Sequence, residues 1–295
     1  MSRTDEAPLA GVRASRTLRA PYLLVAVPTG FLLIFFVVPT MMLLSASILK
    51  SNGMMPVGGL SAGNFRMLLS ESIYVEAIIR TFEIGLAVGV LVVVLAYPLA
   101  YFLVRTTSRW KNLLAALALA PLLASVIVRT YGWWVLFNRD GAINAFLRAS
   151  GIIGRPLIML PSTPAIIVGL AHALLPYGVL TLMATLSGVN PSLERAAMSL
   201  GAGRFRTFTS VTLPLSAPGI AGGFLLAFGV AISAYATPAI LGGPATQTMA
   251  TLIYTFMTTL LNWSLGSAMG AVLLASSFTL LIMTALLSRR RRVAQ

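Results

Sequence analysis

The sequence predicts an all-α polytopic membrane protein with six transmembrane helices. Hydrophobic residues make up 58% of the 295-residue chain and charged residues only 9%, and the mean hydropathy is +0.90. Both values lie far from those of soluble domains. A helix needs about 20 apolar residues to cross a hydrocarbon core about 30 Å thick. Runs of that length occur at 22–48, 84–104, 113–137, 163–186, 219–241 and 265–287.

These runs also set the expected domain organisation. Their unbroken apolar character favours helices over the alternating strands of a membrane barrel. The first run exceeds the roughly 7 to 15 apolar residues of a signal peptide, so we expect it to remain as a span. We therefore predict a transmembrane domain at 22–288 between basic tails at 1–21 and 289–295.

The positions of lysine and arginine predict the orientation in the membrane. Six spans place both termini on one side, and basic residues are retained on the cytoplasmic side during insertion. Fourteen of them fall on the side of the termini: Arg3, Arg13, Arg16, Arg19, Arg105, Arg109, Lys111, Arg195, Arg204, Arg206 and residues 289–292. The opposite side receives Lys50, Arg66, Arg139, Arg148 and Arg155. We expect a multi-pass membrane protein with both termini in the cytoplasm.

Composition argues against several other classes of function. The formal net charge of +14 is explained by basic loops that face anionic lipid headgroups, so no nucleic-acid partner is expected. The chain has no cysteine, seven acidic residues and one histidine. It shows no paired-carboxylate, phosphate-loop or nucleophile-elbow pattern. We expect neither catalysis nor a metal site in this chain.

A few ionisable residues lie in or near the apolar runs. Glu76 and Arg80 have the i,i+4 spacing of an ion pair on a helix surface. His172 lies inside the fourth run, where an ionisable group is a functional candidate, although a histidine bonded between helices would satisfy the same pattern. Glu83 is open to the same two interpretations, as a transport residue or as an interfacial charge.

Several runs contain residues that interrupt or tighten helices. Proline removes a backbone donor and kinks a helix, and prolines occur at Pro98, Pro121, Pro176 and Pro238. We expect Pro238, within SAYATPAILGG, to have a functional role. Small residues permit close helix approach, and the fifth run contains Gly219, Gly222, Gly223 and Gly229. That helix is therefore predicted to pack against protein.

The most distinctive segment is a polar, basic loop at residues 191–214, which reads PSLERAAMSLGAGRFRTFTSVTLP. Pro191 suits the first turn of a helix and Glu194 suits its positive end, which predicts a helix over 192–200. Gly201 then offers a stop. A second short helix is predicted over 204–211. Such a loop either lies on lipid headgroups or binds a partner.

This loop resembles the EAA loop of the permease subunits of bacterial ABC importers. The matching positions are Ala196, Ala197, Gly201, Val211, Leu213 and Pro214. One departure is clear, because Arg195 occupies the position of the motif's glutamate and Glu194 comes one residue earlier. In that family the loop docks as a coupling helix into a separate ATP-hydrolysing subunit. The resemblance leaves open whether Glu194 or Arg195 makes the main ATPase contact.

Further segments resemble the spermidine/putrescine-type branch of these permeases. They are AYPLAYFLV at 96–104, VRTYGWW at 128–134, SAYATPAILGG at 233–243 and NWSLGSA at 262–268. The resemblance implies the type I importer (MetI-like) architecture and a location in the bacterial inner membrane. The expected partners are a second permease in a heterodimer, two ABC ATPase subunits and a periplasmic solute-binding protein. This chain would bind no cofactor, while ATP and Mg would be used by the ATPase.

The resemblance also suggests where solute and partners meet the chain. Tyr235, Thr237 and Pro238 are candidate pore or gate residues, and Arg129, Tyr131 and Trp133 are candidate contacts for the binding protein, although aromatic residues also gather at membrane interfaces. The expected activity is import of a polyamine or related small amine or amino-acid derivative by alternating access. The alternatives are an ATP-independent secondary transporter or channel and a membrane-anchored scaffold.

Overall fold

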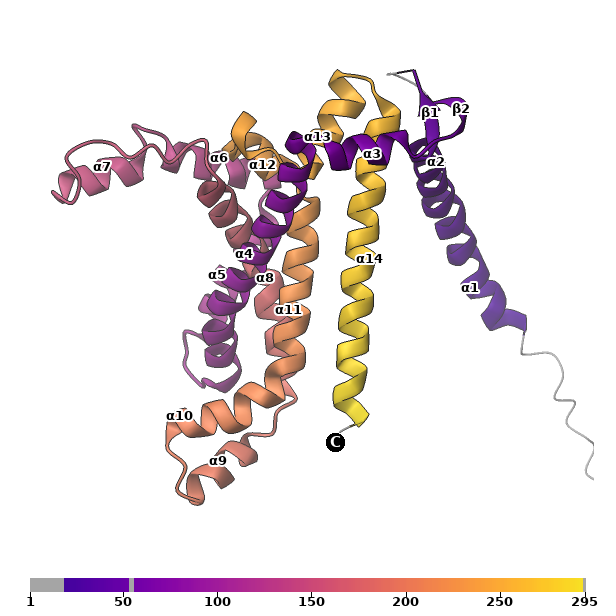
Figure 1. Cartoon of the computed structure of the whole chain (residues 1–295). Helices are drawn as coiled ribbons and strands as arrows, with labels where there is room; N and C mark the ends of the chain where they lie inside the picture. The colour runs from indigo at the N-terminus through magenta and orange to yellow at the C-terminus, as the bar shows by residue number, and fades with distance from the viewer. Residues whose placement is uncertain (1–18, 53–55, 294–295) are drawn as a thin grey trace, which may run out of the picture. The chain divides into compact units, whose positions relative to one another are not determined.

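The computed structural model describes residues 19–52 and 56–293, and almost all of them are helical (Figure 1). The chain divides into two compact units, residues 1–45 and 46–295. The first unit contains α1 (Arg19–Leu32), the π-helix η1 (Leu33–Val37) and most of α2 (Val38–Ser47), which together form a continuous apolar helix at the first predicted span. Its described side chains from residue 25 to residue 45 are exposed or half-buried and mostly apolar, as expected of a helix in lipid.

Three long helices form the core of the second unit. They are α4 (Ser72–Arg105), α8 (Thr163–Ser187) and α11 (Leu213–Ser233), which pack against one another along their lengths (Figure 1). They contain the second, fourth and fifth predicted spans. Gly178 allows α8 to approach α4, because a Cβ atom there would lie 2.6 Å from Val92 Cγ1. A Cβ atom on Gly219 of α11 would lie 2.5 Å from Thr185 Oγ1 of α8.

The third predicted span, 113–137, forms two helices that meet at a bend close to Pro121. Helix α5 (Lys111–Leu119) passes into the 3-10 turn η2 (Ala120–Leu123), and α6 (Val126–Phe137) then leaves at a bend of 102°. Pro121 lies in η2 and provides the physical reason, since its ring removes the backbone donor that a continuing helix needs. Helix α7 (Ala142–Ala149) follows α6.

The fifth predicted run, 219–241, also forms two helices. Helix α11 ends at Ser233, Ala234 adopts an extended conformation, and α12 (Ala236–Leu241) begins two residues later. The ring of Pro238 clashes with the carbonyl four residues earlier in a continuous helix, and that carbonyl belongs to Ala234. The SAYATP sequence therefore places a break where a single span was predicted.

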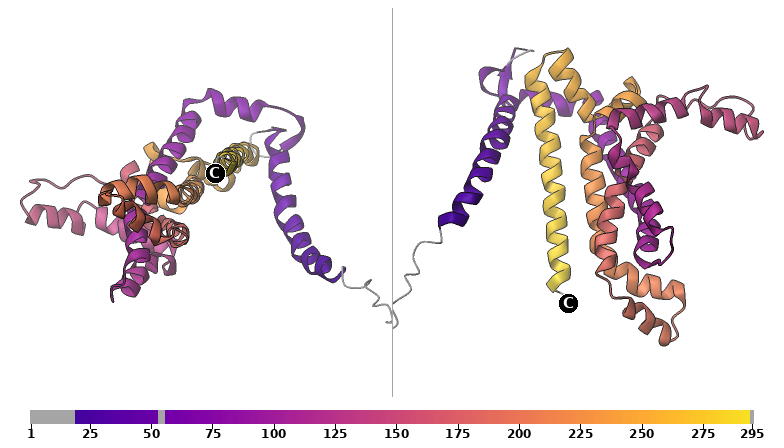
Figure 2. Two further views of the ribbon diagram at one scale, coloured as in Figure 1. Left: turned by 90° about the horizontal axis from the view of Figure 1, so that it is seen from below. Right: turned by 180° about the vertical axis from the view of Figure 1, so that it is seen from behind.

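Shorter elements lie at the end of the unit opposite to the loop 191–214 (Figure 2). Strands β1 (Leu49–Ser51) and β2 (Pro56–Leu60) pair antiparallel, a feature that the all-α expectation missed. They are followed by α3 (Gly63–Ser70). From the later part of the chain come η4 (Pro244–Thr246), α13 (Met249–Tyr254) and the π-helix η5 (Thr255–Thr259).

Helix α14 (Trp263–Val293) closes the chain and contains the sixth predicted run, 265–287. It packs its buried face on α13 and η5 through Leu265, Ala268 and Met269. In the described residues, four helices are long and apolar enough to span a membrane, and the bent pair forms a fifth candidate. These five overlap the first five predicted runs, and α14 contains the sixth.

The close approach at Gly178 generates a stability prediction. Gly178→Val forces side-chain atoms into Val92 and Ala96, and overpacking of this kind costs about 1–3 kcal/mol. We expect a melting temperature lower by several degrees for the purified chain in detergent. Gly229→Val in α11 is the matched control, because a Cβ atom there meets nothing within 4 Å. Equal melting temperatures for the two variants would contradict the packing described above.

Candidate functional site

The loop at 191–214 folds as a helical hairpin beyond the ends of α8 and α11 (Figure 1). Its first helix, α9 (Pro191–Ser199), confirms the helix predicted over 192–200 to within one residue. The Asn190 side chain caps it by accepting a hydrogen bond from the Ser192 N–H at 2.9 Å. Pro191 occupies the first helical position, where a missing N–H costs nothing.

Gly201 ends this helix as predicted. Its φ of +87° lies in the left-handed region, which glycine adopts without steric cost. The Gly201 N–H donates to the Met198 carbonyl at 3.0 Å, and the Ala202 N–H donates to the Ala197 carbonyl at 3.1 Å. This pair of bonds is a Schellman motif. It turns the chain sharply and leaves Leu200 at the tip, 90% exposed.

The second half of the loop continues into the membrane-spanning core. Helix α10 (Arg204–Thr207), the π-helix η3 (Phe208–Thr212) and α11 run on as one 30-residue helix. The short segment predicted over 204–211 therefore corresponds to α10 and most of η3, which continue into α11. The π-helix turn lies before Pro214, whose ring removes a backbone donor. Any displacement of α10 is thus transmitted to α11 without an intervening flexible link.

The loop is also held to the end of α4 by an ion pair, which we name the Arg105–Glu194 clamp. Arg105 Nη2 donates to Glu194 Oε1 at 2.9 Å, and the two side chains are only 17% and 13% exposed. The same Nη2 donates to the Val189 carbonyl at 3.1 Å, and Thr212 Oγ1 donates to Glu194 Oε1 at 3.1 Å. The clamp therefore joins α4, the end of α8, α9 and η3.

Aromatic and hydroxyl groups extend this connection into the core. The hydroxyls of Tyr97 in α4 and Ser216 in α11 share a buried hydrogen bond of 2.8 Å. The Phe208 ring lies edge-on to Tyr97 and Tyr101, with centroid distances of 5.6 and 6.3 Å. Motif residues Val211 and Leu213 are half-buried in this region, whereas Pro214 is exposed. One side of the loop is therefore fixed to the helical core.

The other side of the loop consists mostly of exposed side chains. Arg195, Arg204 and Arg206 are exposed, as are Ala196 and Met198, while Ala197 is half-buried. Phe205 is 81% exposed, close to the value for Leu200. Large apolar side chains with this exposure on a loop that otherwise carries arginines indicate a binding surface. The predicted coupling-loop residues did not include Leu200 or Phe205, although Leu200 directly precedes Gly201 and Phe205 lies in the segment predicted over 204–211.

The candidate docking residues Arg129, Tyr131 and Trp133 lie at the opposite end of the core, on α6. The Trp133 indole N–H donates to His172 Nδ1 at 3.2 Å. Arg129 Nη1 donates to the Ala173 carbonyl at 3.4 Å. Both of these residues are half-buried and join α6 to α8, which gives His172 a structural partner. Tyr131 is exposed and has a free face.

The candidate pore residues also separate into two kinds. Thr237 and Pro238 are buried within the chain, and Thr237 Oγ1 lies 3.2 Å from Thr130 Oγ1. These two residues hold α12 against α6 and do not line a surface of this chain. Tyr235 is exposed and stacks on Tyr254 at a centroid distance of 4.4 Å. Of the three predicted positions, Tyr235 alone presents an accessible side chain.

The two predictions about the second span have different outcomes. The ion pair between Glu76 and Arg80 is confirmed at 3.9 Å, and Arg80 also donates to the Gln247 carbonyl at 3.3 Å. Glu83 is exposed on a face of α4 that is otherwise apolar and includes Leu86 and Val90. A carboxylate at that place borders a shallow apolar cleft of this chain.

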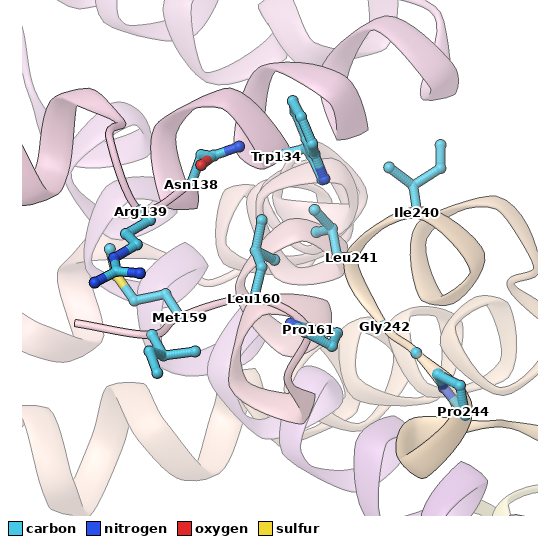
Figure 3. A pocket seen from close by; sticks show the side chains of 12 residues that line it. Trp134, Asn138, Arg139, Met159, Leu160, Pro161, Ile240, Leu241, Gly242 and Pro244 are labelled. Carbon is cyan, nitrogen blue, oxygen red and sulfur yellow. The ribbon is translucent and has the colours of Figure 1, made fainter. Parts of the chain in front are cut away.

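A cavity of about 550 Å³ opens at the same end as the docking candidates (Figure 3). It lies between the end of α6, the extended segment 158–161 and the residues that follow α12. Its walls are mostly apolar, and Arg139 and Asn138 supply polar groups at one side (Figure 3). The lining includes Trp134, Ile158, Leu160, Pro161, Leu241 and Pro244. One sequence feature pointed to this place, the aromatic VRTYGWW segment that ends at Trp134.

Comparisons with known proteins extend over nearly all of these elements. Residues 20–293 match the family described as binding-protein-dependent transport system inner membrane component. The chain is 28% identical over 240 residues to the spermidine/putrescine transport system permease protein PotB of Escherichia coli (strain K12), covering 81% of this chain and 87% of that protein. It is 32% identical over 235 residues to the inner membrane ABC transporter permease protein YdcU of the same strain, covering 75% and 71%.

A solved structure shares the fold. A chain from a bacterial ABC transporter involved in the import of the acidic polysaccharide alginate aligns with a TM-score of 0.75 and 19% identity, covering 92% of this chain and 97% of that chain. The family match includes both the membrane-spanning core and the loop at 191–214. The protein therefore belongs to the family of binding-protein-dependent transport system inner membrane components, and it is a multi-pass permease subunit of an ABC importer, not an enzyme.

Proposed function

We propose that this permease subunit works in an ATP-driven, binding-protein-dependent importer. In it, the loop at 191–214 binds an ATPase subunit and transmits that subunit's movement to the membrane-spanning helices. The observation that carries the proposal is the two-sided character of the loop. One side is joined to α4 and α11 by the Arg105–Glu194 clamp and by a continuous helix. The other side exposes Leu200 and Phe205 to a partner.

The proposed partners follow from this arrangement and from the family. Two ABC ATPase subunits would bind and hydrolyse ATP with Mg, and one of them would hold the loop of this chain. A second permease, in a heterodimer, would complete the pore. When the ATPases close, the loop would move with α4, α8 and α11, and the pore would alternate between inward and outward access. The loop end and both termini would then lie in the cytoplasm.

At the opposite end we propose contact with a periplasmic solute-binding protein. Tyr131 has a free face, and the cavity beside Trp134 is lined by exposed apolar groups such as Ile158. A mostly apolar depression with a few polar groups at its side is the usual form of a recognition surface. Arg129 and Trp133 support this surface from within by their bonds to α8.

The proposed solute is a polyamine or a related small amine or amino-acid derivative. PotB, named as a spermidine/putrescine permease, is a relative over 81% of this chain. The stacked, exposed rings of Tyr235 and Tyr254 fit a cationic solute, because aromatic faces attract ammonium groups. Tyr235 lies at the break between α11 and α12, where a moving solute would meet an interrupted helix.

The coupling role predicts that Gly201→Asp uncouples the importer. A side chain at this position strains the left-handed turn and adds a charge beside Leu200. In proteoliposomes with all partner subunits, we expect solute-stimulated ATP hydrolysis and uptake to fall at least about tenfold. Gly151→Asp is the matched control, since Gly151 also ends a short helix with a positive φ, of +71°, but lies beyond α7 at the other end. Equal uptake by the two variants would contradict the coupling role.

The outer surface predicts a separate effect at Ile158. This side chain is 84% exposed and lines the cavity, so Ile158→Asp places a charge in the proposed contact. We expect the half-saturating concentration of the binding protein to rise about tenfold, the loss typical of one important interface residue. Ile152→Asp changes an equally apolar, 67% exposed residue outside the cavity and should have little effect. Similar titrations for both variants would refute the assigned surface.

A further inference from the structure

The acidic residue of the loop 191–214 does not belong to its exposed side. Glu194 is the sole acidic residue of that segment. Its Oε1 atom accepts hydrogen bonds from Arg105 Nη2 and Thr212 Oγ1, and the Glu194 side chain is 13% exposed. A charge-assisted bond of this length is among the stronger polar contacts in proteins. The carboxylate therefore neutralises Arg105 inside the chain and is not directed toward a partner.

The exposed side of the loop is basic. Arg195, Arg204 and Arg206 are exposed, and none of them forms an ion pair within the described residues. They flank Leu200 and Phe205, the two most exposed large apolar side chains of the loop. We name these five residues the docking face. It combines apolar anchors with a rim of arginines, and arginine and aromatic residues are enriched at protein interfaces.

From this distribution of charge we propose that the docking face binds an apolar cleft with an acidic rim, and that Arg195 forms an ion pair there with a carboxylate of the ATPase subunit. This inference rests on the proposed function, since it specifies the partner surface for the same loop. It reverses the sign of the contact implied by the glutamate of the EAA motif, whose position Arg195 occupies. Complementary charge of this kind selects partners and steers their association.

The position of the hairpin favours a protein partner over the lipid surface. A basic loop with an exposed phenylalanine also suits anionic headgroups. However, α9 and α10 lie beyond the ends of α8 and α11 (Figure 2). The clamp holds α9 in that position. Arg195 and Leu200, on α9 and directly after it, are thus presented beyond the end of α8.

The test uses the assembled complex and a charge reversal. Arg195→Glu should reduce retention of the ATPase subunit by the purified permease complex at least about tenfold, with the greatest loss at low salt, where charge contacts are least screened. Arg148→Glu is the matched control, because Arg148 is exposed at the other end on α7 and should leave retention unchanged.

Other outcomes separate this inference from the proposed function. If Phe205→Asp abolishes ATPase retention while Arg195→Glu leaves it intact, the loop docks on the ATPase subunit but Arg195 forms no ion pair there. The proposed acidic rim would then be refuted. If neither variant changes retention, both the inference and the proposed function fail.

The lipid alternative has its own measurement. Retention of the ATPase subunit by the wild-type and Arg195→Glu permease complexes is compared in nanodiscs of neutral lipid and of neutral lipid with anionic phosphatidylglycerol. If the reversal changes ATPase retention equally in both lipids, the expected result, the contact is with protein. Retention that responds to Arg195→Glu in anionic nanodiscs alone would show a lipid contact and overturn the proposal.

Discussion

The charge-assisted bond between Arg105 and Glu194 is the contact on which the functional arrangement depends. It joins the last residue of α4 to the helix of a loop 89 residues away in sequence. Both side chains are largely buried, so loss of either partner leaves an uncompensated charge, which is strongly destabilising. With the clamp in place, the loop 191–214 is an extension of the membrane core with a fixed orientation.

The core itself is suited to move as a body. Glycines at the contacts between α4, α8 and α11 bring the helices together without space for rearrangement, as at Gly85, where a Cβ atom would lie 2.5 Å from Ile232 Cγ2. Close-packed interiors transmit displacement and do not absorb it. The breaks in the helices lie elsewhere, after η2 and after α11. The resulting division between a rigid core and interrupted outer segments fits alternation between two states of access.

Much of this was predictable from local sequence. The apolar runs marked the spans, and Pro191 and Gly201 marked the ends of α9. Pro121 and Pro238 signalled interruptions, but a proline pattern does not state whether a helix kinks or ends. The clamp was not predictable, because the direction of Glu194 depends on a partner in another span. Burial of Thr237 likewise depends on the packing of α12 against α6, which residue type alone does not reveal.

The chain contains no cysteine, so a single introduced cysteine is the one thiol of this subunit and sets the crosslinking position within it. The most direct test of the account places a cysteine at Leu200, at the exposed tip of the loop, in the assembled importer in native membranes. A photoactivatable crosslinker on this thiol should capture the ATPase subunit, whereas the same crosslinker at Ile152, at the other end of the core, should not. Two results would contradict the assignment of the loop as the ATPase-binding site: crosslinking of the ATPase subunit from Ile152, or no crosslinking from Leu200 in an active complex.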